Sequence, residues 1–289
     1  MIGASALVLA GGSRAGGTLQ VRRVGSLPVA ASRVAAVALP GGRLMVLGGL
    51  VAGSSSDEIL VGPPGALRRV GQLPAPTHDA AAVRTSTAVE LFGGGESVSS
   101  ASVVTVDPQT GAARSAGTLS EPLSDLGAVS VGARAFLVGG YTGSRFASAV
   151  LRVGPHASTT TIARLPQGLR YAGVAAIGPI IYAVGGLTTG GETSSIVAID
   201  TRSGSVRTIG HLASAVAHAP LVARDSVLYL IGGTAGSGAT TTAILRIDPR
   251  TGSATVAGHL PAPLADASAV TLGGQIVVLG GGGRAVYAF

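Results

Sequence analysis

Six short apolar segments, each ended by a pair of glycines, recur along almost the whole chain of 289 residues. In a typical member, residues 180–184 read Ile-Ile-Tyr-Ala-Val and are followed by Gly185 and Gly186. The first glycines of the six pairs are Gly48, Gly93, Gly139, Gly185, Gly232 and Gly280, so successive pairs lie 45 to 48 residues apart. A period of this length indicates a repeat protein, in which each repeat buries its apolar face against its neighbours.

A second marker fixes the register of the repeats. A leucine, usually followed by proline, stands 20 residues before the glycine pair in five repeats and 21 residues before it in the first. The six leucines are Leu27, Leu73, Leu119, Leu165, Leu212 and Leu260. Between the two markers lies a stretch rich in alanine and valine, such as residues 172–176. Small side chains of this kind suit the crowded centre of a radial array.

Each repeat continues with features of β-hairpins. A variable loop follows the glycine pair, and then a strand with period-two alternation, such as residues 196–200. An Asp-led turn that ends on glycine, such as residues 200–204, connects it to a more polar fourth strand. Four antiparallel strands per repeat, without any segment of helical periodicity, predict an all-β fold of six blades, a β-propeller.

The ends of the chain predict how the ring of blades closes. The last repeat reaches Phe289 after its third strand, and residues 18–25 resemble residues 66–71, which form a predicted fourth strand. We therefore expect residues 18–25 to complete the C-terminal blade, so that residues 18–289 form a single propeller without open edges at this junction. Residues 1–17 are expected to form an N-terminal stub or linker, with a truncated signal or anchor as the alternative.

Residues 18–289 resemble the kelch-repeat family in two features. A glycine pair follows a hydrophobic strand that carries an aromatic residue, as at Phe136, Tyr182 and Tyr229, and a Leu-Pro connection joins successive repeats. The repeats depart from the kelch pattern because they lack the tryptophan that usually precedes this connection. The resemblance implies a six-bladed kelch-like propeller whose connections line the mouth of a central funnel.

Composition excludes several classes of chemistry. The chain has no cysteine, and all 20 of its basic residues are arginine. Thiolate nucleophiles, cysteine-ligated zinc, Schiff bases and the lysine of a phosphate-binding loop are therefore excluded. No zinc-protease, serine-hydrolase or calcium-loop motif occurs, and we expect no cofactor or metal. The arginine bias is typical of a GC-rich genome, and we expect a bacterial protein located outside the cytoplasm.

The net charge of +7 and the sequence pI of about 10.9 raise nucleic acid as a partner. The arginines are scattered almost singly over the repeats, however, and aromatic residues make up only 3% of the chain, which leaves few stacking platforms. We therefore expect no nucleic-acid partner. No apolar run reaches the roughly 20 residues of a membrane-spanning helix, so we expect no membrane span and a monomeric protein.

The connections into the innermost strands supply the candidate binding residues. The position six residues after each leucine marker holds Arg33, Asp79, Asp125, Tyr171, His218 and Asp266, and two of the preceding positions hold His78 and Arg170. Loops after the glycine pairs add Glu96 and Arg145 on the same face. These residues are polar and differ between repeats, whereas the strands are nearly uniform, which is typical of a binding surface on a repeat scaffold. The alternative is that aspartates at turns serve only local backbone hydrogen bonds.

Glu90 occupies a strand position that is apolar in the other five repeats. A buried carboxylate is costly unless it is paired or hydrated. We expect an ion pair with Arg43 or Arg134 of a neighbouring blade, with a catalytic role as the alternative.

Three functions fit these observations. The first is a non-catalytic propeller that binds a protein or glycan through the funnel face. The second is a sugar mutarotase- or epimerase-like enzyme acting on an acidic sugar such as sialic acid. Kelch-like sialic acid mutarotases use arginine and acidic residues at the funnel mouth, and the resemblance assigns such roles to Arg33, Arg170, Arg145 and Glu96. The third is a structural or assembly module that binds through its rim.

Overall fold

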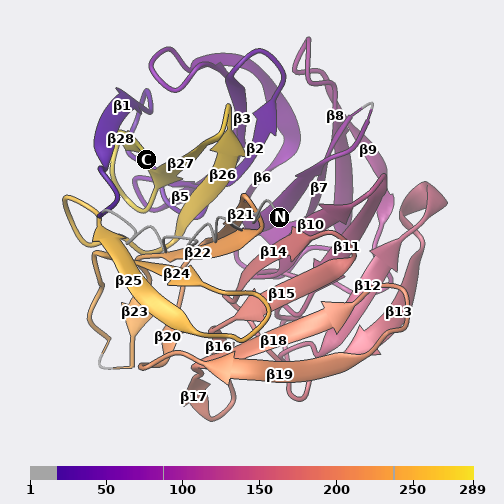
Figure 1. Ribbon diagram of the computed structural model, residues 1–289. Coiled ribbons are helices and arrows are strands. Elements are labelled where there is room, and N and C mark those ends of the chain that lie inside the picture. The colour runs from indigo at the N-terminus through magenta and orange to yellow at the C-terminus, as the bar shows by residue number, and fades with distance from the viewer. Residues whose placement is uncertain (1–17, 87, 237) are drawn as a thin grey trace, which may run out of the picture.

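The computed structural model describes residues 18–86, 88–236 and 238–289, whose regular secondary structure is almost entirely β-strand and is arranged around a common centre (Figure 1). Strands β2 (Ala35–Leu39), β14 (Gly173–Ile177) and β26 (Ala267–Leu272) lie near that centre, and β13 (Thr159–Arg164), β19 (Val206–His211) and β25 (Ala254–His259) lie at the periphery. A 3-10 turn, η1 (Pro155–Ala157), interrupts the strands. The arrangement is propeller-like. The expected N-terminal stub, residues 1–17, lies outside the described residues.

Four separate sheets contain four antiparallel strands each, in the orders β1-β28-β27-β26, β10-β11-β12-β13, β14-β15-β18-β19 and β21-β22-β24-β25. Their other strands are β1 (Arg22–Ser26), β10 (Gly127–Val131), β11 (Arg134–Val138), β12 (Ala149–Val153), β15 (Ile180–Val184), β18 (Ser195–Asp200), β21 (Leu221–Arg224), β22 (Val227–Ile231), β24 (Ala243–Ile247), β27 (Gln275–Gly280) and β28 (Ala285–Ala288).

A longer sheet has the order β2-β3-β5-β6-β7-β8-β9. Its further strands are β3 (Arg43–Leu47), β5 (Ser54–Gly62), β6 (Arg68–Arg84), β7 (Val89–Gly95), β8 (Ser102–Val106) and β9 (Ala113–Thr118). Residues 68–77 of β6 pair with β5, whereas residues 78–84 pair with β7. Strand β6 therefore crosses from one four-stranded group to the next without a break.

Short strands in the loops after the glycine pairs, and in one connection after a leucine marker, extend the structure at one end of the sheets. Strand β4 (Leu50–Val51) pairs with β5, β16 (Leu187–Thr188) with β17 (Gly191–Glu192), and β20 (Val216–Ala217) with β23 (Thr234–Ala235). We call this end, where the glycine pairs lie, the funnel end. The opposite end, where the turns lead into the second and fourth strands, is the turn end.

The two sequence markers have clear structural roles. All six marker leucines are buried, with at most 5% of their surface exposed. Gly185 has a φ of +62°, and a Cβ there would lie 2.2 Å from the carbonyl oxygen of Val216. The next glycine, Gly186, donates its N–H to that same oxygen at 2.8 Å. Glycine is therefore needed for the second strand to end against the connection into the next repeat.

The hydrophobic core consists of layers between neighbouring sheets. Phe136 and Val150 of one sheet pack with Ile181 and Val197 of the next, and equivalent clusters recur around the molecule. One cluster joins Leu27, Leu44 and Val46 of the first repeat to Val277 and Val286 of the last. Because each repeat buries its apolar faces against two neighbours, the first and last repeats also stabilise each other.

The N-terminal strand lies where the sequence places it. Strand β1 pairs antiparallel with β28, from Arg22 opposite Ala288 to Ser26 opposite Ala285. The N–H of Leu27 then donates to the carbonyl of Arg284 at 2.7 Å. The strand begins at Arg22 and so lies a few residues later than the expected 18–25.

Candidate ligand-binding site at the funnel mouth

The six positions that follow the leucine markers form a closed ring at the funnel end. These ring residues are Arg33, Asp79, Asp125, Tyr171, His218 and Asp266, and their φ angles lie between 53° and 59°, a left-handed conformation that is uncommon outside glycine. The N–H of each donates to the carbonyl of the ring residue in the preceding repeat, and Arg33 donates to Asp266, at 2.8 to 3.3 Å. The left-handed turn is therefore the joint between repeats, and all six ring residues line one channel.

Arg33 joins two carboxylates of the ring. Its Nη1 donates to Oδ2 of Asp79 at 2.9 Å, and its Nε lies 3.6 Å from Oδ2 of Asp266. Oδ1 of Asp266 lies 2.6 Å from Nδ1 of His218, whose ring stacks on Tyr171 with 3.8 Å between centroids. Burial raises the pKa of Asp266, but the hydrogen bond and charge of His218 and the charge of Arg33 outweigh it, so this pKa lies below its ordinary value. Asp266 is thus a carboxylate that orients His218.

Arg170 lies within an aromatic cluster. Its Nη2 is 2.7 Å from Oδ2 of Asp125 and donates to the Tyr171 hydroxyl at 2.8 Å. The guanidinium carbon lies 4.4, 4.8 and 5.4 Å from the ring centroids of Tyr171, Tyr141 and Phe146. Its Nε is buried and has no hydrogen-bond partner among the described residues. The Arg170 guanidinium is therefore held at the edge of the site by the Asp125 carboxylate, which is only 3% exposed, and by the faces of three aromatic rings.

Asp79 is the most perturbed carboxyl group of the site. Its side chain is 9% exposed, and burial raises its pKa to about 7. The like charge of Asp125 and a side-chain hydrogen bond with it contribute to this rise, whereas the charge of Arg33 opposes it. A carboxyl group with a pKa near neutrality exchanges protons at physiological pH and can serve as a general acid or base. Burial, together with the charges of the same two carboxylates, raises the pKa of Tyr171, so its phenol stays protonated.

His78 extends this network outward from the ring. Its Nδ1 lies 2.8 Å from the Ser55 hydroxyl, and its Nε2 lies 3.6 Å from Oδ2 of Asp79. Burial lowers the pKa of His78, and the positive charge of Arg33 lowers it further. The imidazole is therefore neutral at pH 7 and can both donate and accept a hydrogen bond.

Two hollows meet at the ring. The central channel, of about 210 Å³, is lined by the ring and by small residues of the innermost strands. A second hollow of about 310 Å³, the mouth pocket, is lined by Arg33, His78, Asp79, residues 95–99, Ser124, Asp125, Tyr141, Gly143, Arg170 and Tyr171. Its volume lies at the lower end of the range for small-molecule sites.

Nine of the ten candidate residues meet at these two hollows. Arg33, His78, Asp79, Glu96, Asp125, Arg170 and Tyr171 line the mouth pocket, and His218 and Asp266 line the channel. Arg145 does not join them. Its side chain is 60% exposed, pairs with Oε2 of Glu121 at 2.5 Å, and lines a separate outer hollow. The ion pair with Glu121 thus holds Arg145 on the rim and not at the mouth.

Three contributors to the site are not among the residues predicted from the sequence. Ser55 binds His78, Ser99 contacts the Ser124 hydroxyl at 3.0 Å, and Phe146 lies beside Arg170. The two serines stand in serine-rich loops and carry no signal that separates them from their neighbours. Phe146 did carry a signal in the sequence, because it is one of only four phenylalanines in the chain and lies in a loop.

The expected ion pair of Glu90 is absent from the described residues. Glu90 is half-buried and lies between Val83 and Thr105 in the strand ladder. Arg43 instead donates to the carbonyl of Pro40 at 3.3 Å. Burial raises the pKa of Glu90. The predicted ion pair was wrong because the strand ladder places uncharged residues beside the Glu90 carboxylate.

Within residues 18–86, 88–236 and 238–289, no group of three or more His, Asp or Glu side chains is placed to hold a metal ion. The same part of the chain contains no helix that is long and apolar enough to cross a membrane.

No protein-family model matches the chain, and no curated protein matches it significantly. Its fold is similar to a solved structure described as "Structure of YjhT", with a TM-score of 0.77 over 90% of this chain and 94% of that chain. The sequence identity is 15%. At this identity the similarity shows the fold alone, and it agrees with the propeller-like arrangement of the sheets.

Proposed function

We propose that the protein is a six-bladed, kelch-like propeller that binds a small acidic sugar at the mouth pocket and interconverts its anomers, a mutarotase- or epimerase-type activity. The observation that carries the proposal is the buried pair Asp79 and Asp125. The pKa of Asp79 is about 7, and the pair lies in a pocket that also contains Arg33 and Arg170.

Three observations support six blades. The chain has six glycine pairs, and the ring contains six equivalent residues joined by a closed cycle of backbone hydrogen bonds. The longer sheet divides into two four-stranded groups within β6, at the change of partner between Thr77 and His78. Counted in this way, the longer sheet contributes two blades and the separate sheets contribute four.

The pocket offers the groups that an acidic sugar requires. Nη2 of Arg33 makes no hydrogen bond or ion pair within the described residues. It can therefore donate a hydrogen bond to the carboxylate of an acidic sugar. The hydroxyls of Ser99, Ser124 and Tyr141 can bind sugar hydroxyls at the same wall. Protonation of Asp79 removes a negative charge from the pocket, so an anionic ligand binds more tightly as the pH falls through about 7.

Anomer exchange needs one acid and one base. The base removes the proton of the anomeric hydroxyl while the acid protonates the ring oxygen, so the ring C–O bond breaks and a carbonyl forms. Rotation about the adjacent C–C bond and the reverse proton transfers close the ring with the opposite configuration, and no proton or electron is consumed overall. Protonated Asp79 serves as the acid, and His78, which lines the same pocket and is neutral at pH 7, serves as the base.

The test is anomer exchange by NMR with N-acetylneuraminic acid as the probe. Asp79→Asn should lower the exchange rate at least about a hundredfold, because the amide cannot transfer the proton. Asp225→Asn is the matched control, since Asp225 has the same left-handed backbone but a side chain that is 92% exposed in a turn. If the parent bound the sugar without accelerating exchange, the catalytic part would be wrong. If it neither bound nor accelerated, both parts would fail.

A non-catalytic role in binding a protein or glycan at the same face is the second candidate. It is favoured by a further hollow of about 380 Å³, which shares residues 95–99 with the mouth pocket and is lined by Leu73, Pro74 and Val98. Val98 is 77% exposed. A ligand larger than one sugar would contact both hollows. Pro74→Ser changes a residue that lines only the further hollow, so it should weaken binding of the larger ligand while leaving that of a monosaccharide unaffected.

A further inference from the structure

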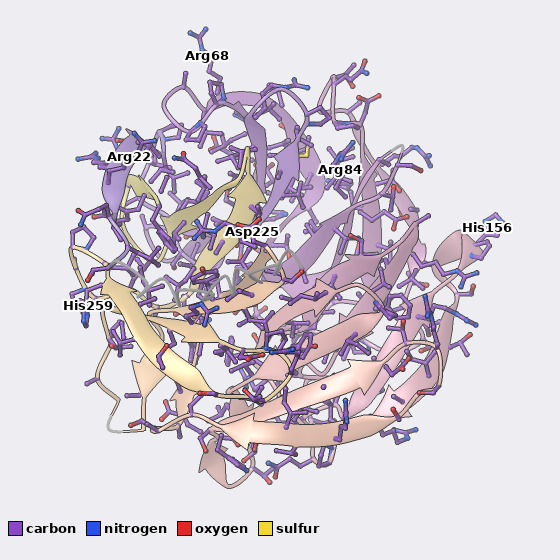
Figure 2. All side chains as sticks on the ribbon, viewed as in Figure 1. Arg22, Arg68, Arg84, His156, Asp225 and His259 are labelled. Atoms are coloured by element: carbon purple, nitrogen blue, oxygen red, sulfur yellow. The ribbon has the colours of Figure 1, made fainter. Side chains whose placement is uncertain are left out.

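One arginine of every repeat lies in the same cross-strand row. The row starts three residues before each glycine pair, at Met45, Glu90, Phe136, Tyr182, Tyr229 and Val277. Through the strand pairing it reaches Arg68, Arg114, Arg152, Arg207, Arg246 and Arg22 on the third or fourth strand. We call these six residues the arginine belt. Five are exposed and Arg152 is half-buried, and Arg22 and Arg68 are seen at the outer edge of the molecule (Figure 2).

The row divides the charge of the molecule unevenly. At the row or on its turn side lie twelve arginines (Arg22, Arg43, Arg68, Arg84, Arg114, Arg134, Arg152, Arg202, Arg207, Arg224, Arg246 and Arg250) and five carboxylates (Glu90, Asp107, Asp200, Asp225 and Asp248). On its funnel side lie seven arginines (Arg23, Arg33, Arg69, Arg145, Arg164, Arg170 and Arg284) and eight carboxylates (Asp57, Glu58, Asp79, Glu96, Glu121, Asp125, Glu192 and Asp266). Arg14 lies outside the described residues. The net positive charge is therefore concentrated at the turn end.

The belt arginines are not neutralised by partners. Within the described ranges none of the six forms an ion pair, and Arg22 only donates to the amide oxygen of Gln275, at 3.3 Å. The nearby carboxylates of Asp107, Asp200 and Asp248 accept backbone N–H groups of their own turns. The positive charges of the belt are thus available to an external anion.

We propose that the turn end docks on the anionic surface of a lipid bilayer, with the funnel mouth facing away from the membrane. Because the belt lies at one height around the molecule, all six of its charges can act on a planar surface at the same time. A linear nucleic acid could reach only the charges of neighbouring blades. Each arginine near an anionic membrane contributes to binding, and the attraction acts within a Debye length of about 8 Å at physiological salt.

The proposed contact is electrostatic and peripheral. The large hydrophobic side chains that are exposed, Val29, Val70, Val98 and Val256, all lie on the funnel side of the row. No described side chain of this kind can therefore insert into the bilayer from the turn end. Binding should fall steeply as salt is added.

The test is sedimentation with phosphatidylcholine vesicles that contain or lack phosphatidylglycerol, at low and at physiological salt. The parent should bind only the anionic vesicles. The variant Arg68→Gln/Arg114→Gln/Arg207→Gln/Arg246→Gln should bind them at least about tenfold more weakly. The matched control Arg23→Gln/Arg69→Gln/Arg145→Gln/Arg164→Gln removes the same charge from the funnel side and should bind like the parent.

The proposal would be overturned by any of three results. The parent could fail to bind anionic vesicles, the two variants could lose affinity equally, or the parent could bind duplex DNA more tightly than vesicles at the same salt. Melting temperatures of both variants show that they fold. Asp79→Asn should bind vesicles like the parent, so this test does not depend on the activity proposed for the funnel.

Discussion

The two ends of the propeller carry their charges in opposite ways. At the funnel end, Arg33 pairs with Asp79, whose side chain is 9% exposed, and Arg170 pairs with Asp125, whose side chain is 3% exposed. At the turn end, the belt arginines are mostly exposed and form no ion pair within the described residues. Burial and ion pairing hold charged side chains in fixed positions and perturb their pKa values, as at Asp79. Exposed charges instead produce an electrostatic field that salt can screen.

The backbone does not explain this difference, because it is nearly the same in every repeat. The six ring residues share one left-handed conformation and one hydrogen-bonding pattern, yet their side chains include arginine, aspartate, tyrosine and histidine. The belt also recurs in one row of the ladder in every repeat, on the third or the fourth strand, but there the same side-chain type recurs. Where equivalent positions carry different side chains, as in the ring, they form a binding site. Where equivalent positions carry the same side chain, as in the belt, they form a uniform surface.

The largest expected effect comes from breaking the buried pairing. Arg170→Ala should lower the free energy of unfolding by about 3–5 kcal/mol, because it leaves the Asp125 carboxylate buried without its cation. At the opposite end, Arg114→Ala should change it by less than about 0.5 kcal/mol. Urea denaturation of both variants measures the contrast.

A double-variant cycle sharpens this comparison. Arg170→Ala/Asp125→Ala should cost less than the sum of the two single changes, because neither partner is then left alone. Additive effects would show that the 2.7 Å contact between the two side chains contributes little.

The sequence predicted the parts of this structure that depend on local sterics. The glycine pairs and leucine markers placed the second strands and the ring, because a left-handed glycine and a buried leucine are required at the same point of each repeat. The pairing of β1 with β28 followed from counting strands at the two ends. Six blades stays a prediction that the cycle of ring hydrogen bonds supports.

Side-chain partners in loops of variable length could not be predicted. Phe146 contacts Arg170, whereas its neighbour Arg145 turns outward to Glu121. The belt was also invisible along the sequence, where the arginines are scattered singly. It appears only in the ladder, because bulges such as the one between Val150 and Leu151 set which residue lies opposite which.

The second expected effect is a pH dependence that belongs to the funnel end alone. Burial raises the pKa of Asp79 to about 7 in the folded state, against roughly 4 in an unfolded chain. The folded state therefore holds this proton more tightly, and the stability it contributes below the unfolded pKa is lost as the pH rises towards 7. The slope is at most about 1.4 kcal/mol per pH unit.

Asp79→Asn should remove this slope, so the parent gains stability over the variant as the pH is lowered from about 7 to about 5. His78 acts in the opposite direction, because its lowered pKa makes the folded state lose stability as the pH falls through roughly 6.5. Only the difference between parent and variant in urea denaturation at several pH values isolates Asp79. Parallel curves would mean that Asp79 titrates alike in both states.

The smallest expected effect is at the turn end. Replacing Arg68, Arg114, Arg207 and Arg246 with glutamine relieves repulsion among exposed like charges, so the free energy of unfolding at low salt should rise by a few tenths of a kcal/mol. The control with Arg23, Arg69, Arg145 and Arg164 replaced should show no rise, because it loses the ion pairs of Arg69 and Arg145. At about 1 M salt the Debye length is about 3 Å, and the gain should disappear. A gain that persisted there would come from strand propensity or packing, and the contrast between the two ends would then not be one of charge.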